Sequence, residues 1–84
     1  MRETKQPPVA TVAVGHVQGA IWRNVSEGAT FYNSTFSLRY REMGGEWKTS
    51  TSYTQLDLLA LAKCADLAFD KIEGLKRQDK ENSQ

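Results

Sequence analysis

Apolar and polar residues alternate with a period of two through FYNSTFSLRYRE, residues 31–42. This alternation predicts a β-strand, because successive side chains of a strand point to opposite faces of a sheet. One face would carry the apolar and aromatic side chains, and the other the polar and basic ones. These are Tyr32, Phe36, Leu38 and Tyr40 on the first face, and Asn33, Thr35, Ser37, Arg39 and Arg41 on the second.

Further strands are predicted on both sides of this segment. VATVAVGHVQGAIWRN is rich in β-branched residues, and its Gly15 and Gly19 indicate a bulge or bend in one long strand, or a pair of strands. The paired glycines of EMGGE predict a turn, after which WKTSTSY resumes the alternation. Together these segments predict an antiparallel sheet of three to four strands.

A single helix is predicted after the sheet. Thr54 can cap its first turn, with Asp57 at the capping-box spacing, and the helical pattern continues to about Arg77. Its apolar residues occupy an arc of roughly 160°, wide enough for one side to cover the sheet while a flank contacts another molecule. The arc comprises Leu58, Leu61, Ala62, Cys64, Ala65, Ala68, Phe69, Ile72 and Leu75.

The 84 residues suffice for one small α+β domain. We expect an ordered unit over residues 9–77 between polar, disordered tails at 1–8 and 78–84. One helix covers only one face of a sheet, so a second copy is a common way for so short a chain to complete its core. We therefore expect a homodimer, formed through the C-terminal helix.

Charge and hydropathy narrow the classes of protein. Eleven basic and ten acidic residues give a net charge of +1, which argues against a strongly basic DNA-coating protein but permits a local basic patch. No apolar run reaches the length of about 18 residues that a membrane span requires, and no secretion signal is evident. A single cysteine, Cys64, fits a reducing compartment. We expect a cytoplasmic protein that does not bind membranes.

Catalytic chemistry has little support in the sequence. His16 is the only histidine and Cys64 the only cysteine, and no pattern places an acid, a base and a nucleophile together. One histidine and one cysteine cannot supply the usual four ligands of a structural zinc site. We predict no enzyme activity, no metal site and no cofactor.

The predicted sheet is the better candidate for a functional site. Its basic residues are interleaved with aromatic ones, a combination that binds single-stranded nucleic acid because rings stack on bases and cations hold phosphates. The same residue types also occur on solvated strands and in cores, so an interaction module that does not bind nucleic acid is the alternative. The candidate residues are Arg23, Arg39, Arg41 and Lys48 for phosphates, and Trp22, Trp47 and Tyr40 for stacking.

Residues 12–75 resemble the positive cofactor four family, whose members are transcriptional coactivator-like domains that bind single-stranded DNA. VGHVQGAIW resembles the first strand of that family, FSLRYREMGGEWK its aromatic and basic hairpin, and TSYTQLDLLALAKCADLAFDKI its entry into the closing helix. The resemblance implies a four-stranded sheet and a helix, a dimer formed through the helices, and channels for single strands between opposed sheets.

The resemblance also extends to individual positions. Arg39 and Arg41 match the basic and aromatic residues near the end of the second hairpin strand, and Lys48 matches a lysine beyond the turn. The chain departs from the family at NVSEGAT, which has Glu27 where the family has a lysine-rich hairpin. Fewer phosphate contacts predict weaker binding that depends less on salt. The sequence leaves DNA and RNA open as ligands.

Overall fold

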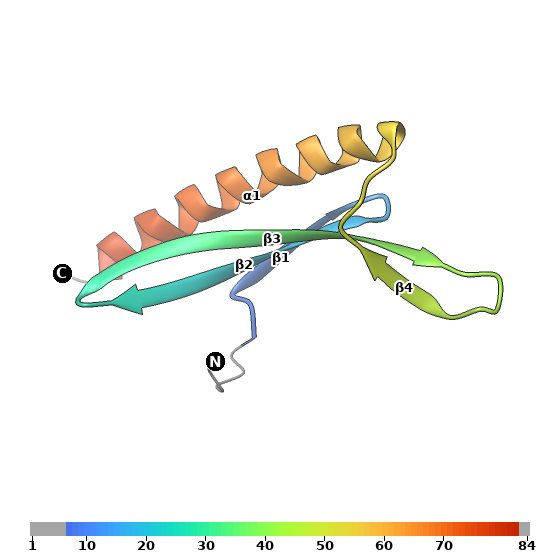
Figure 1. Ribbon diagram of the computed structural model, residues 1–84. Coiled ribbons are helices and arrows are strands. Elements are labelled where there is room, and N and C mark those ends of the chain that lie inside the picture. The colour runs from blue at the N-terminus through green and yellow to red at the C-terminus, as the bar shows by residue number, and fades with distance from the viewer. Residues whose placement is uncertain (1–6, 83–84) are drawn as a thin grey trace.

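The protein folds as a four-stranded antiparallel sheet followed by one long helix, which confirms the predicted α+β class. The computed structural model describes residues 7–82, and the strands follow one another in space in the order β1-β2-β3-β4 (Figure 1). The elements are β1 (Ala10–Val14), β2 (Val17–Ser26), β3 (Ala29–Arg41), β4 (Trp47–Ser50) and α1 (Gln55–Asn82).

Tight turns join neighbouring strands, and each contains residues in the left-handed backbone region. Gly15 has φ 60° between β1 and β2, so the first predicted segment is a pair of strands. Glu27 and Gly28 have φ 51° and 81° between β2 and β3, where a two-residue hairpin turn requires positive φ. Gly45 has φ 90° between β3 and β4, in the predicted glycine turn.

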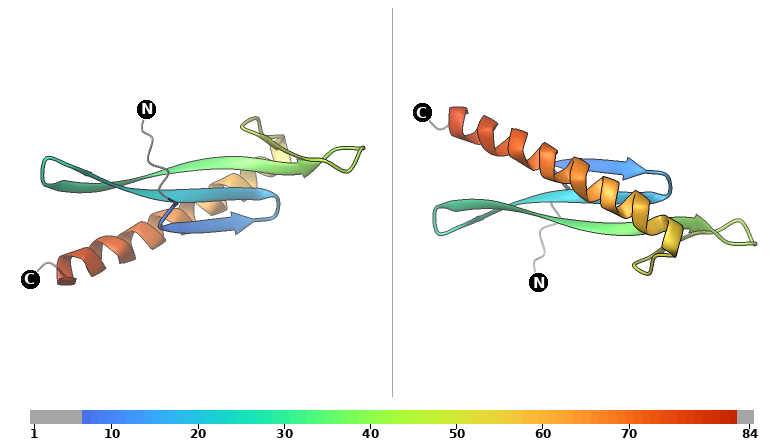
Figure 2. Two further views of the ribbon diagram at one scale, coloured as in Figure 1. Left: turned by 90° about the horizontal axis from the view of Figure 1, so that it is seen from below. Right: turned by 90° about the horizontal axis from the view of Figure 1, so that it is seen from above.

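The core lies between the sheet and the helix, which packs over β1 and β2 and crosses the strands obliquely (Figure 2). Val17, Ile21 and Cys64 are fully buried there, and the Cys64 thiol donates a hydrogen bond to the carbonyl oxygen of Val17 at 3.4 Å. The ring of Phe36 lies directly over Gly19, where an added Cβ would be 2.6 Å from the ring carbon Cε1. Gly19 therefore creates room for an aromatic ring in the core.

The helix begins where the sequence predicts. The backbone N–H of Thr54 donates to Asp57 Oδ2 at 3.2 Å, and Asp57 N–H donates to Thr54 Oγ1 at 3.4 Å, so each residue satisfies an otherwise unpaired group of the first turn. The prediction that α1 ends near Arg77 was wrong, because the helix continues to Asn82. The reason is tertiary, since Asp79 contacts the β2–β3 hairpin through Arg23 and Tyr32.

The predicted tails are only partly described. Residues 78–82 belong to α1, whereas residues 1–6 and 83–84 lie outside the described part of the chain. Pro7 and Pro8 precede β1 without regular structure. Among residues 7–82, no helix has both the length and the apolar character needed to span a membrane.

Candidate nucleic-acid interface

The pairing register divides the strand side chains between two faces, because directly opposed residues of an antiparallel pair point the same way. Pairs such as Val17↔Leu38 and Gly19↔Phe36 face α1. Pairs such as Gln18↔Ser37 and Arg41↔Trp47 point to the other side, which we call the open face. The open face comprises Thr11, Ala13, Gln18, Ala20, Trp22, Asn24, Ser26, Ala29, Phe31, Asn33, Thr35, Ser37, Arg39, Arg41, Trp47 and Thr49.

The charges of the open face are all positive. None of the four strands contains an aspartate or a glutamate, and the ionisable side chains that the strands place on this face are Arg39 and Arg41. The nearest carboxylates in sequence are in the turns, at Glu27, Glu42 and Glu46. A negatively charged ligand would therefore be attracted to the open face.

The two arginines of the open face lie over one aromatic ring. The guanidinium carbon Cζ of Arg39 is 4.8 Å from the centroid of the Trp47 ring, and that of Arg41 is 5.8 Å away. Both distances are within the range of cation–π attraction. Trp47 is nevertheless 54% exposed, so part of its ring is accessible to a ligand.

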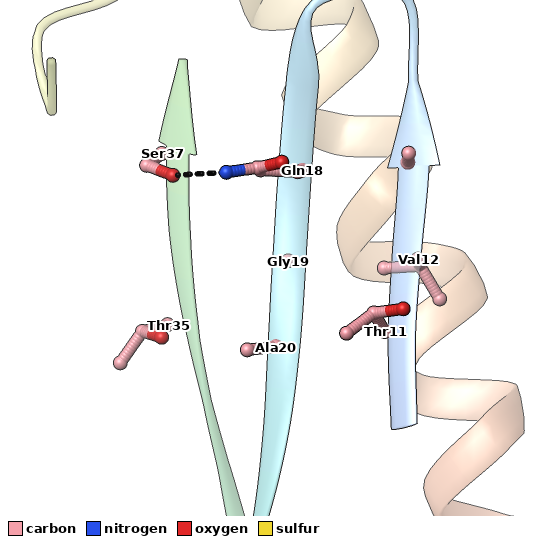
Figure 3. Close-up of a pocket in the computed structure, with 8 residues that line it drawn as sticks. Thr11, Val12, Gln18, Gly19, Ala20, Thr35 and Ser37 are labelled. Carbon is pink, nitrogen blue, oxygen red and sulfur yellow. Dashed lines mark hydrogen bonds between the residues drawn. The ribbon is translucent and has the colours of Figure 1, made fainter. Parts of the chain in front are cut away.

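A shallow groove runs along the open face over small side chains. One hollow of about 270 Å³ lies over β1, β2 and β3, and a second of about 260 Å³ lies beside the β1–β2 turn. The two share Ala13 and Gln18, so they adjoin. Figure 3 shows the first hollow with the helix behind the strands, and the residues labelled there are Thr11, Val12, Gln18, Gly19, Ala20, Thr35 and Ser37.

Two hydrogen bonds join side chains of β2 to side chains of β3 on the open face. Gln18 Nε2 donates to Ser37 Oγ at 3.3 Å, and Trp22 Nε1 donates to Thr35 Oγ1 at 3.2 Å. The second bond satisfies the indole N–H of Trp22, whose side chain is partly buried. These cross-strand pairs fix side-chain rotamers, so the face offers a pre-ordered surface to a ligand.

The seven predicted site residues do not all lie on this surface. Trp22, Arg39, Arg41 and Trp47 belong to the open face, as described above. Arg23, Tyr40 and Lys48 point to the helix side. Arg23 pairs with Tyr32, and Lys48 pairs with Tyr40. Tyr32 and Tyr40 lie an even number of residues from Leu38 on β3, so they share the face that Leu38 turns to α1. The predicted cluster of four basic residues is therefore divided between the two faces.

The three residues on the helix side have other contacts. Lys48 Nζ is 3.7 Å from Glu46 Oε1, and Arg23 Nε is 3.5 Å from Asp79 Oδ2. Tyr32 donates a hydrogen bond to Asp79, and contact with Tyr32, together with the charge of Asp79, raises the pKa of Arg23 above its usual value. Arg23 therefore links the hairpin to the helix instead of facing a ligand on the open face.

The candidates for catalysis lie apart from any assembled site. His16 is exposed in the β1–β2 turn, beside the smaller hollow. Cys64 is buried under the sheet, and burial raises the pKa of its thiol, which favours the neutral form. Within residues 7–82, no three His, Cys, Asp or Glu side chains are grouped so that they could hold a metal ion.

One surface residue was missed by the sequence reasoning. Phe31 lies on the open face of the β2–β3 hairpin and is 51% exposed. It is two residues from Asn33, so the same period of two that assigned Asn33 to the polar face would also have assigned Phe31.

The comparisons with known proteins identify no relative of this chain. No protein-family model, no curated protein and no solved structure matches it.

Proposed function

We propose that the protein binds single-stranded nucleic acid on the open face of its sheet, with low sequence specificity. One observation carries the proposal: two arginines and three aromatic rings lie along the one sheet face that the helix leaves uncovered. The aromatic rings are Trp22, Phe31 and Trp47. Aromatic stacking contributes about 1–3 kcal/mol per base and tolerates any sequence, because every base has a π face.

The dimensions of the face support a short binding site. Asn33, opposite Trp22, and Arg41, opposite Trp47, are eight residues apart on β3. At about 3.3 Å per residue, the two tryptophans are separated by about 26 Å along the strand. A single strand rises at least about 3.4 Å per nucleotide, so a segment of at most about eight nucleotides would connect them.

Fluorescence gives a direct test, because the chain has two tryptophans and both lie on the open face. Titration with an unstructured oligonucleotide should quench their emission. With two arginines contacting phosphates, the logarithm of the affinity should fall with the logarithm of salt concentration with a slope of about −1.4. Unchanged fluorescence together with no gel shift at low salt would reject the proposal.

A homodimer through the helix is part of the proposal, and one observation supports it. Leu58, Ala62, Ala65 and Phe69 form an exposed stripe on α1 with the spacing of four and three residues typical of helix pairs. Leu58 is 50% exposed and Phe69 is 62% exposed. Two copies that joined these stripes would bury apolar surface that a monomer leaves in water.

The same stripe favours a second candidate function, a dimeric structural or protein-interaction module that does not bind nucleic acid. Light scattering after size exclusion, followed by oligonucleotide titration, separates the two. The interaction module is favoured if the wild-type protein is a dimer, Phe69→Asp is a monomer, and neither protein binds an oligonucleotide. Lys63→Asp, on an exposed part of the same helix, serves as the control for an added carboxylate.

A further inference from the structure

The positive charge of the open face is concentrated at one end of the groove. Arg39 and Arg41 are two residues apart on β3, a separation of about 6.6 Å along an extended strand. Both guanidinium groups nevertheless approach the same ring, that of Trp47. Two positive charges therefore meet beside one residue, while the rest of the open face contributes hydroxyl, amide, methyl and aromatic groups.

The sheet ends at this end of the groove in a turn without basic residues. Glu42 follows Arg41 directly and Glu46 precedes Trp47, so both side chains alternate to the helix side, where Glu46 Oε1 lies 3.7 Å from Lys48 Nζ. The turn between them is tight, since Glu42 N–H donates to the carbonyl oxygen of Glu46 at 2.9 Å. A phosphodiester chain that continued past Arg41 would meet no further positive charge on the open face, because residues 42–46 include no lysine or arginine and Lys48 lies on the helix side. The charge pattern therefore favours a strand that stops at the arginines.

The other side of the arginines offers space for a base. The hollow of about 260 Å³ has Gln18, His16, Arg39 and Trp47 among its lining residues, and it is smaller than the pockets of about 300–1,000 Å³ that hold drug-sized ligands. Gln18 uses Nε2 in its bond to Ser37, which leaves its carbonyl oxygen to accept from a base. The adjoining hollow leads towards Ala20 and Thr35, next to Trp22.

We propose that the open face binds the phosphorylated end of a single strand, an inference that rests on the proposed function. The terminal phosphate lies between Arg39 and Arg41, and the terminal base occupies the hollow beside Trp47. The following nucleotides extend along the groove towards Trp22. A terminal phosphate monoester carries a charge of about −1.5 to −2 at neutral pH, which two guanidinium groups can neutralise, whereas an internal phosphodiester carries one negative charge.

The test uses oligothymidine of about ten nucleotides in three forms: hydroxyl groups at both ends, a 5′-phosphate, or a 3′-phosphate. One phosphorylated form should bind at least tenfold more tightly than the hydroxyl form, and the preferred end gives the direction of the bound strand. Arg41→Gln and Arg39→Gln should each remove most of this preference. Arg77→Gln, which removes an exposed charge from α1, should leave the preference unchanged.

The possible outcomes separate this inference from the proposed function. If none of the three oligonucleotides binds, the proposed function fails. If all three bind within about twofold of one another, nucleic-acid binding stands and the terminal-phosphate site is rejected. A preference that survives in both arginine variants also rejects it. Thymidine monophosphate is the competitor for a free-nucleotide site, and competition equal to that of the phosphorylated oligonucleotide would overturn the assignment to strand ends.

Discussion

The two faces of the sheet are built from the same strands and differ in what covers them. The helix side carries Val17, Ile21 and Leu38 under α1, where they are buried. The open face carries Trp22, Arg39 and Trp47, with no element of the described chain packed over them. Neighbouring residues therefore have opposite roles: Trp22 points to the open face, whereas Ile21 is buried under α1 and Arg23 pairs with Asp79 of the helix. Substitutions on one face should change stability, and those on the other should change binding.

The largest expected effect is on the helix side. Ile21→Ala should lower the free energy of unfolding by about 2–5 kcal/mol, because it leaves a cavity at a fully buried position. Chemical denaturation followed by circular dichroism measures the loss. Val25→Ala is the matched control on the same strand, since Val25 is 62% exposed, and it should cost far less. Equal losses in the two variants would contradict the assignment of the core.

The next effect concerns binding on the open face. Trp22→Ala should weaken the binding of oligothymidine by about 1–3 kcal/mol, the contribution of one stacked base. Lys48→Ala removes a residue of the helix side that pairs with Glu46, and should change the affinity less than twofold. Fluorescence anisotropy of a labelled oligonucleotide measures both. A larger loss of affinity from Lys48→Ala than from Trp22→Ala would contradict the assignment of the binding site to the open face.

Sequence periodicity predicted the elements of this fold well because local patterns determine them. The alternation around Arg39, the glycine turn before Trp47 and the Thr54 cap each depend on residues close together in sequence. The end of the helix could not be predicted in this way. Asp79 is held by residues more than forty positions earlier, and the polar sequence around it has the composition of a tail.

The candidate site was only partly predictable for a similar reason. Adjacent strand residues point to opposite faces, so Trp22 and Arg23, or Trp47 and Lys48, cannot share a surface. The sequence alone therefore shows that the seven candidates must divide between the two faces. It does not show which half faces the helix, because both faces of this sheet contain aromatic and polar residues. The register of pairing and the position of α1 decide that question.

The smallest expected effect is at the β2–β3 hairpin, where Tyr32 reaches from the helix side of the sheet to Asp79. Tyr32→Phe removes this hydrogen bond and should lower the free energy of unfolding by about 1 kcal/mol or less. Faster hydrogen exchange confined to residues 23–32 and the last turns of α1 would report the loosened contact. Equal exchange in the two proteins would show that the bond does not anchor the hairpin.

The pH dependence of this contact provides a second readout. Burial, followed by the hydrogen bond to Asp79, raises the pKa of Tyr32 above its usual value of 10. The native state therefore favours the protonated phenol, and the stabilisation is fully present below pH 10, the unfolded-state pKa. It should be lost as the pH rises through the higher pKa of the folded state. The difference in stability between the wild-type protein and Tyr32→Phe should thus be constant from neutral pH to about pH 9 and shrink above pH 10. A difference that grew above pH 10 would mean that the phenolate, and not the phenol, is the form bound at the hairpin.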